Sequence, residues 1–74
     1  MAVFTIAFGS GDELNIEVAG FDSAAALAAK LDREGYVVGM KIGFVPSGGP
    51  KPTPKPYGEI AVMRALVKSI RLHD

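Results

Sequence analysis

All five prolines of this 74-residue chain stand within eleven residues, from Pro46 to Pro56, together with Gly48 and Gly49. Because each proline fixes its own φ and restricts the residue before it, Lys51–Pro56 is expected to be extended and similar to polyproline II. The segment is too short for a second domain and long for a connector. We therefore expect a single domain over residues 1–74 that contains a Pro/Gly-rich loop at 46–58.

Before this loop, hydrophobic periodicity predicts a β-hairpin followed by one helix. Two alternating runs, Val3–Phe8 and Leu14–Val18, flank a glycine-rich turn, which is the pattern of a hairpin. The helix is rich in alanine, and Asp22 is expected as its N-cap and Gly35 as its C-terminal stop. Two leucines four residues apart give the helix a narrow inward stripe, formed by Leu27 and Leu31.

A third strand is predicted over Tyr36–Val45, and both of its faces are apolar. The face expected in the core carries Tyr36, Val38, Met40, Ile42 and Phe44. Small aliphatic residues give the sheet a second apolar face, which is more than one helix can cover; it comprises Val3, Ala7, Val37 and Val45. An uncovered apolar face of this size indicates an interface, so we predict a homo-oligomer.

The last segment, Glu59–Asp74, is compatible with a helix or with two strands, Glu59–Met63 and Lys68–Leu72, around a turn. We favour the strands because the end of the segment alternates and its β-branched residues suit a sheet. The resulting fold is α+β, with a curved and mostly antiparallel sheet in the order β-β-α-β-loop-β-β packed on one Ala-rich helix.

The chain has no cysteine and a single histidine, the penultimate residue His73. These counts exclude a disulfide scaffold, a thiolate zinc site and any site that needs two imidazoles. So close to the end of the chain, His73 is expected to be a solvated terminal residue rather than a general base. The acidic residues are scattered, without the spacing of a calcium loop. We predict no enzymatic activity, no catalytic residue, no metal site and no cofactor.

Charge is segregated along the chain although its total is zero. Residues 1–34 hold two bases and six acids, a net charge of −4, and residues 35–74 hold six bases and two acids, a net charge of +4. If the later strands share a face, that face is basic; the opposite charges can instead pair across the sheet or between subunits. The neutral total argues against a strong nucleic-acid binder.

No apolar run approaches eighteen residues, and the first lysine is Lys30. A membrane-spanning helix needs an apolar run of about that length, and a signal peptide needs a basic residue nearer the start of the chain. We therefore expect no membrane association and a cytoplasmic protein.

The Pro/Gly-rich loop and the basic residues after it are the candidate ligand contacts. Glycines allow backbone N–H groups to converge on an anion and a lysine adds charge, so Ser47–Lys51 can wrap an anion; a flexible loop is the simpler alternative. Tyr57 is the aromatic residue expected at the surface, where it can stack on a base while basic side chains hold phosphates. The predicted ligand-binding residues are Gly48, Gly49, Lys51, Lys55, Tyr57, Arg64 and Arg71.

In plan, the chain resembles the small accessory proteins that bacteriophages encode. The resemblance rests on a cysteine-free single sheet, one Ala-rich helix and the closing segment Glu59-Ile60-Ala61-Val62-Met63…Val67-Lys68-Ser69-Ile70-Arg71. Several such proteins counter bacterial defence, by blocking a defence protein or by sequestering its nucleotide signal as oligomers.

The resemblance implies a non-enzymatic, oligomeric binding protein that sequesters an anionic small molecule such as a cyclic nucleotide. A protein–protein inhibitor or adaptor that covers its partner with a basic face is the alternative. A weak nucleic-acid binder is the third possibility. The resemblance carries no binding-site residues over to this chain.

Overall fold

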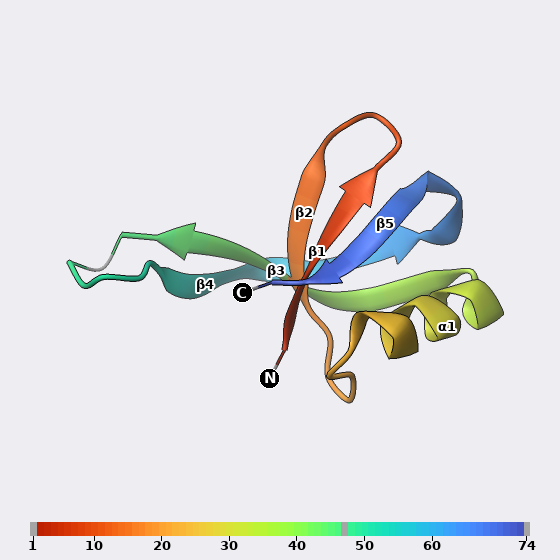
Figure 1. Cartoon of the computed structure of the whole chain (residues 1–74), viewed down its shortest axis with the longest axis horizontal. Helices are drawn as coiled ribbons and strands as arrows, with labels where there is room; N and C mark the ends of the chain where they lie inside the picture. The colour runs from red at the N-terminus through yellow and green to blue at the C-terminus, as the bar shows by residue number, and fades with distance from the viewer. Residues whose placement is uncertain (1, 47, 74) are drawn as a thin grey trace.

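The computed structural model describes residues 2–46 and 48–73, and it shows one five-stranded antiparallel sheet with a single helix (Figure 1). The strand order across the sheet is β4-β3-β2-β1-β5. The α+β class and the order of the elements are therefore confirmed. The elements are β1 (Val3–Phe8), β2 (Glu13–Glu17), α1 (Ala24–Glu34), β3 (Tyr36–Val45), β4 (Thr53–Met63), the 3₁₀ turn η1 (Arg64–Leu66) and β5 (Val67–Leu72).

The hairpin of β1 and β2 forms where alternation predicts it. Phe4 lies opposite Ile16 and Ile6 lies opposite Leu14, so the large apolar residues of both strands share one face. Gly11 has φ 97° in the turn, and its N–H bonds to the carbonyl of Phe8 at 3.0 Å. Glycine adopts this left-handed conformation without a steric penalty, which lets the chain reverse in few residues.

Helix α1 is bounded by Ser23 and Gly35. Ser23 is extended and its Oγ accepts a hydrogen bond from the N–H of Ala26 at 3.2 Å, so the prediction of Asp22 as N-cap is wrong by one residue. At the other end Gly35 has φ 81° and its N–H bonds to the carbonyl of Leu31, as the sequence predicts. Leu27 and Leu31 are both buried, which confirms the inward stripe.

We call the face of the sheet that packs on α1 the inner face and the opposite one the outer face. The core lies between the inner face and the two helix leucines. On β3, Val37 and Ile42 are buried, whereas Tyr36 and Val38 lie on the outer face and are exposed. The buried cluster consists of Phe4, Ile6, Leu14, Ile16, Val18, Leu27, Leu31, Val37 and Val62.

Two predictions about β3 are therefore wrong. Of the face predicted for the core, Tyr36 and Val38 are exposed and only Ile42, beyond a register shift after Met40, is buried. Val37 is buried and cannot belong to a second apolar face with Val3 and Ala7. The reason is the close approach of β2: a Cβ on Gly39 would stand 2.6 Å from the carbonyl oxygen of Glu17 and within 3 Å of the Ile16 side chain. The glycine-bearing face thus packs inward, where only a residue without a side chain fits.

Lys41 is the last residue of β3 opposite β2, and from there β3 and β4 continue as a two-stranded arm, which we call the ribbon (residues 41–57). It projects along the 40 Å long axis of the molecule (Figure 1). The segment expected as a loop over 46–58 is paired as strand from Thr53, which lies opposite Val45. β4 tolerates Pro54 and Pro56 because it is an edge strand, which needs partners on one side only.

The last segment forms two strands around a short turn, as favoured from the sequence; Asp74 itself lies outside the described residues. β4 and β5 are the opposite edges of the sheet, yet η1 joins them in three residues. A flat five-stranded sheet would separate its edges by about 19 Å, four strand spacings, which is too far for such a link. The sheet is therefore rolled, and α1 contacts both β3 and β5 across its open side.

Candidate binding site

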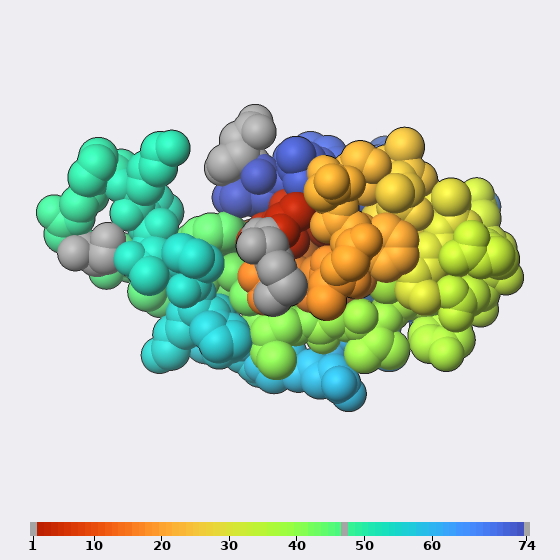
Figure 2. Space-filling model, turned by 90° about the horizontal axis from the view of Figure 1, so that it is seen from below, coloured from red at the N-terminus to blue at the C-terminus, as the bar shows by residue number. Residues whose placement is uncertain are grey.

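The ribbon bends back over the end of the sheet and borders an open cleft of about 490 Å³, which we call the ribbon cleft. Figure 2 shows the far end of the ribbon turned toward the C-terminal end of β5. The cleft is assembled from three places that are distant in the sequence: the start of β1, the ribbon and the end of β5. Its lining residues are Ala2, Val3, Phe44, Lys51, Pro52, Leu72 and His73.

His73 holds the ribbon against the sheet. Its ring stacks on that of Phe44, with centroids 4.4 Å apart and an interplanar angle of 16°. Its backbone N–H extends the pairing of β5 with β1 by donating to the carbonyl of Val3 at 2.8 Å. His73 is exposed, as expected, but it is not a free chain end, because its ring and its backbone N–H are both engaged.

A polar relay behind this stack fixes the orientation of the His73 ring. Nδ1 of His73 lies 3.3 Å from the hydroxyl of Thr5, and that hydroxyl donates to Oδ1 of Asn15 at 2.7 Å. Since the Thr5 proton is committed to Asn15, Nδ1 carries the hydrogen in the bond with Thr5. Thr5 is only 3% exposed, so the hydroxyl at the centre of the relay is shielded from solvent.

The ribbon cleft combines apolar walls with nitrogen-bearing side chains. Val3, Phe44, Pro52 and Leu72 contribute hydrocarbon surface, while Lys51 brings a positive charge from the ribbon. A cleft of this composition suits a small molecule that has an apolar or aromatic part and a negatively charged group. No carboxylate is among the lining residues of the described chain.

The two predicted arginines lie elsewhere and are neutralised by carboxylates. Arg71 donates two hydrogen bonds to Glu13, at 3.0 and 3.2 Å, and Arg64 forms an ion pair with Asp32. The hydrogen bond and the charge of Arg71 hold the pKa of Glu13 below its usual value, and Glu13 in turn raises the pKa of Arg71. Both pairs join the acidic first half of the chain to the basic second half, so the two arginines do not form a basic face.

The remaining predicted residues lie on the ribbon but outside the cleft lining. Lys55 Nζ stands 5.8 Å from the centroid of the Tyr57 ring, and that ring covers the position where a side chain on Gly43 would stand. Tyr57 is exposed, as expected. Gly48 and Gly49 are exposed near the tip, and their expected neighbour Ser47 lies outside the described residues.

Of the seven predicted residues, the structure thus places Lys51 alone in the cleft lining. Sequence reasoning missed Phe44 and His73, which form the centre of the site. The alternation at the end of β5 puts His73 on the same face as Arg71, but its contact with Phe44 depends on the bend of the ribbon. No local pattern in the sequence indicates that bend.

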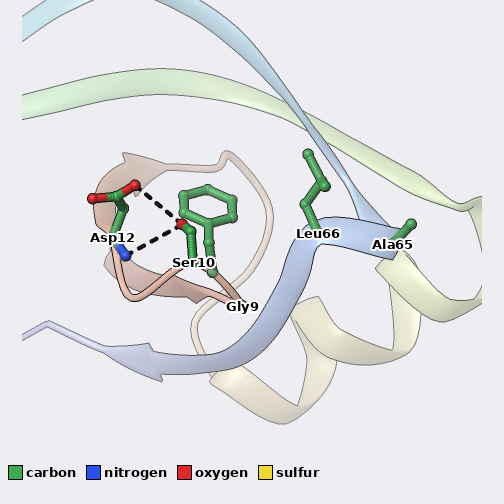
Figure 3. Close-up of a pocket in the computed structure, with 6 residues that line it drawn as sticks. Gly9, Ser10, Asp12, Ala65 and Leu66 are labelled. Atoms are coloured by element: carbon green, nitrogen blue, oxygen red, sulfur yellow. Dashed lines mark hydrogen bonds between the residues drawn. The ribbon is translucent and has the colours of Figure 1, made fainter.

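A second cleft, of about 430 Å³, lies between the β1–β2 turn and η1 (Figure 3). The N–H of Gly9 donates to the carbonyl of Leu66 at 3.2 Å and closes one end, while Ser10 donates to Asp12 at 3.0 Å. This cleft contains none of the predicted residues, and Asp12 is its one charged lining residue in the described chain. A carboxylate without a neighbouring base is unsuited to an anionic ligand.

Comparisons of the chain with protein-family models, with curated proteins and with solved structures find no match. Within residues 2–46 and 48–73, no three His, Cys, Asp or Glu side chains are grouped as metal ligands. In the same residues, no helix is both long and apolar enough for a membrane crossing.

Proposed function

We propose that this protein is a non-enzymatic binding protein that holds a small anionic molecule in the ribbon cleft. The observation that carries the proposal is the return of the ribbon over the sheet, which brings Lys51 to the same cleft as the stacked rings of Phe44 and His73. Sequestration of a nucleotide signal in the cytoplasm, as the phage resemblance implies, is one form of this function.

Each part of the cleft has a role in this proposal. Lys51 supplies the charge that selects an anion, whatever intramolecular contact it makes before the ligand arrives. The apolar walls of Val3, Pro52 and Leu72 take up the uncharged part of the ligand. A volume of about 490 Å³ lies within the range of about 300–1,000 Å³ usual for small-molecule sites.

The arrangement favours binding over catalysis. The hydroxyl–imidazole contact of Thr5 and His73 has the components of an activated nucleophile. However, Thr5 is buried and donates its proton to Asn15 rather than to His73. A ligand in the cleft therefore meets the Phe44–His73 stack and not a reactive oxygen.

The test compares two lysines of the same ribbon. Lys51→Ala removes a cleft residue, whereas the control Lys55→Ala removes an equal charge from a residue outside the lining. Binding of a panel of nucleoside phosphates and cyclic dinucleotides is measured by calorimetry and by native mass spectrometry. We expect Lys51→Ala to weaken binding about tenfold or more and Lys55→Ala much less, since a hydrogen bond to a charged group contributes about 1.5–3 kcal/mol.

Other outcomes would reject the ribbon cleft as the site. Equal losses in the two variants would show that the ribbon attracts anions by charge alone. Binding that falls steeply with salt and extends to oligonucleotides would favour the nucleic-acid hypothesis instead. No binding of any compound in the panel, together with capture of an acidic protein, would favour the inhibitor hypothesis.

A protein partner is the second candidate function, and the charge of the ribbon favours it. The ribbon carries Lys41, Lys51 and Lys55, with no acidic residue from Gly35 to Gly58. A projecting basic arm of this kind can lie on an acidic surface of another protein. This basic surface is the ribbon itself and not the face with Arg64 and Arg71 that the sequence predicts.

A further inference from the structure

An apolar strip on the outer face of β3 and β4 is covered by no element of residues 2–46 and 48–73. Tyr36 is 47% exposed, Val38 42% and Met63 53%. Tyr36 lies directly opposite Met63 in the register of the two strands, and Val38 lies opposite Ala61. These four residues form one continuous patch, which we call the outer strip, and it reaches the free edge of the sheet at β4.

The edge beside this strip is unprotected over residues 59–63. Proteins commonly guard an edge strand with proline or with charged side chains, lysine above all. The ribbon half of β4 has Pro54 and Pro56, and the opposite edge strand β5 carries Lys68 and Arg71. The sequence from Glu59 to Met63 is EIAVM, with one charge at its first residue and neither proline nor lysine.

We propose that a second copy of this chain covers this edge by pairing β4 with β4 in antiparallel fashion about a two-fold axis at Ala61. In this register Ile60 of each copy lies opposite Val62 of the other on the inner face. On the outer face Glu59 lies opposite Met63 and Ala61 opposite Ala61. The two sheets become one of ten strands, and the two outer strips meet at the axis.

Three observations favour a second copy as the occupant. First, a two-fold axis brings an identical open edge to each protomer, so one contact pairs the free edges of both copies. Second, the register places no like charges opposite each other, and Glu59 falls next to the position of Arg64 in the other copy. Third, Pro56 at one end and η1 at the other limit the pairing to the unguarded residues.

The side chains of the paired segment add to the strand contact. Met63 of each copy lies beside Glu59 and Ala61 of the other, and Ile60 lies beside Val62, whereas Tyr36 and Val38 stay on the outer surface of the joined sheet. Five paired residues resemble an isolated hairpin, which is marginal in water, so a weak, concentration-dependent dimer is expected. This inference uses none of the residues of the ribbon cleft, so it stands or falls separately from the proposed ligand.

Because the chain has no cysteine, single cysteines can test the axis directly. Antiparallel neighbours lie about 4.5–5.5 Å apart at Cα, within the range that a disulfide can bridge. Ala61→Cys should therefore form a disulfide-linked dimer under mild oxidation. The control Ala29→Cys, an equally small substitution on the exposed side of α1, should not.

A charge swap at the same position gives a second measurement. In the two-fold register, Ala61→Lys places two like charges opposite each other, and so does Ala61→Glu. Each variant alone should be monomeric by native mass spectrometry, and an equimolar mixture should form the heterodimer. Both variants should keep their folded circular dichroism spectrum, because Ala61 is exposed.

The proposal is overturned if the wild-type chain is monomeric over the whole accessible concentration range. It is also overturned if a dimer forms that Ala61→Cys does not cross-link, or that both charged variants leave intact, since the contact then lies on another face. The Lys51→Ala variant should dimerise like the wild type, which separates this result from the test of the ligand site.

Discussion

Two regions of the molecule, the rolled sheet with its helix and the projecting ribbon, differ in burial and in charge. The sheet and helix, which we call the body, contain nearly all the buried residues, whereas the described residues of the ribbon beyond Val45 are exposed. The body holds five bases and eight acids, a net charge of −3, and the ribbon holds three bases and no acid, a net charge of +3. Stability thus resides in the body, while the ribbon is free to carry recognition.

The strongest test of this division is a core truncation set against a ribbon substitution. The side chain of Leu27, on α1, is completely buried against the inner face of the sheet. Leu27→Ala should destabilise the fold by about 2–5 kcal/mol because the cavity cannot close fully, which lowers Tm by about 8 °C or more. Thr53→Ala, on the exposed ribbon, should change stability by no more than about 0.5 kcal/mol. Thermal melts of the two variants make the comparison.

If the two substitutions shift Tm by similar amounts, the ribbon contributes to the cooperative fold and the division is wrong. If neither shifts it, then Leu27 is not packed as described. Either outcome would also weaken the use of ribbon variants as probes of binding alone.

The two glycines of β3 give a finer comparison, since one lies in the body and the other in the ribbon. A methyl group on Gly39 would meet the backbone oxygen of Glu17, which cannot move without shifting β2. Gly39→Ala should therefore cost about 1–3 kcal/mol. A methyl group on Gly43 would meet the ring of Tyr57, an exposed side chain that can rotate away. Gly43→Ala should cost less than about 1 kcal/mol.

Chemical denaturation of both variants measures this difference. Equal costs would mean that the Tyr57 ring is fixed as firmly as the β2 backbone. The fluorescence of the tyrosines should change in Gly43→Ala, because Tyr57 loses its position over the strand.

The body was largely predictable from the sequence because its signals are local. Alternation marks the strands, Gly35 ends the helix in a left-handed conformation, and Leu27 and Leu31 show which side of α1 is buried. The N-cap of α1 is Ser23 and not the predicted Asp22, which is its neighbour and a residue type that can serve the same purpose. What alternation does not decide is which of two apolar faces of β3 turns inward. That choice depends on the close packing of Gly39 on β2, a contact between strands.

The ribbon and the cleft were predicted less well because their geometry is not local. Prolines indicate an extended chain, and an extended chain next to a free strand becomes an edge strand when the register allows it. The meeting of His73 with Phe44 follows from the bend of the ribbon and the length of β5 together. The arginines were assigned to a ligand on charge alone, whereas the fold provides Glu13 and Asp32 as their partners.

The smallest expected effect concerns one of these ion pairs in the body. Arg71 holds the pKa of Glu13 below its usual value of 4.5, so the pair stabilises the folded state above about that pH and the contribution is lost as the pH falls through the lowered pKa. Glu13→Gln should lower Tm slightly at neutral pH, because both groups are exposed and solvent screens their attraction.

The shape of the pH dependence is what distinguishes this pair from a general effect of charge. The Tm difference between wild type and Glu13→Gln should shrink as the pH falls below about 4.5, because protonated Glu13 and glutamine are equivalent toward Arg71. Glu17→Gln removes a carboxylate from the same strand that makes no ion pair within the described residues, so it is the matched control for the loss of one negative charge. A difference that stays constant down to acidic pH would mean that the Glu13–Arg71 pair adds nothing to the body beyond the packing of the two side chains.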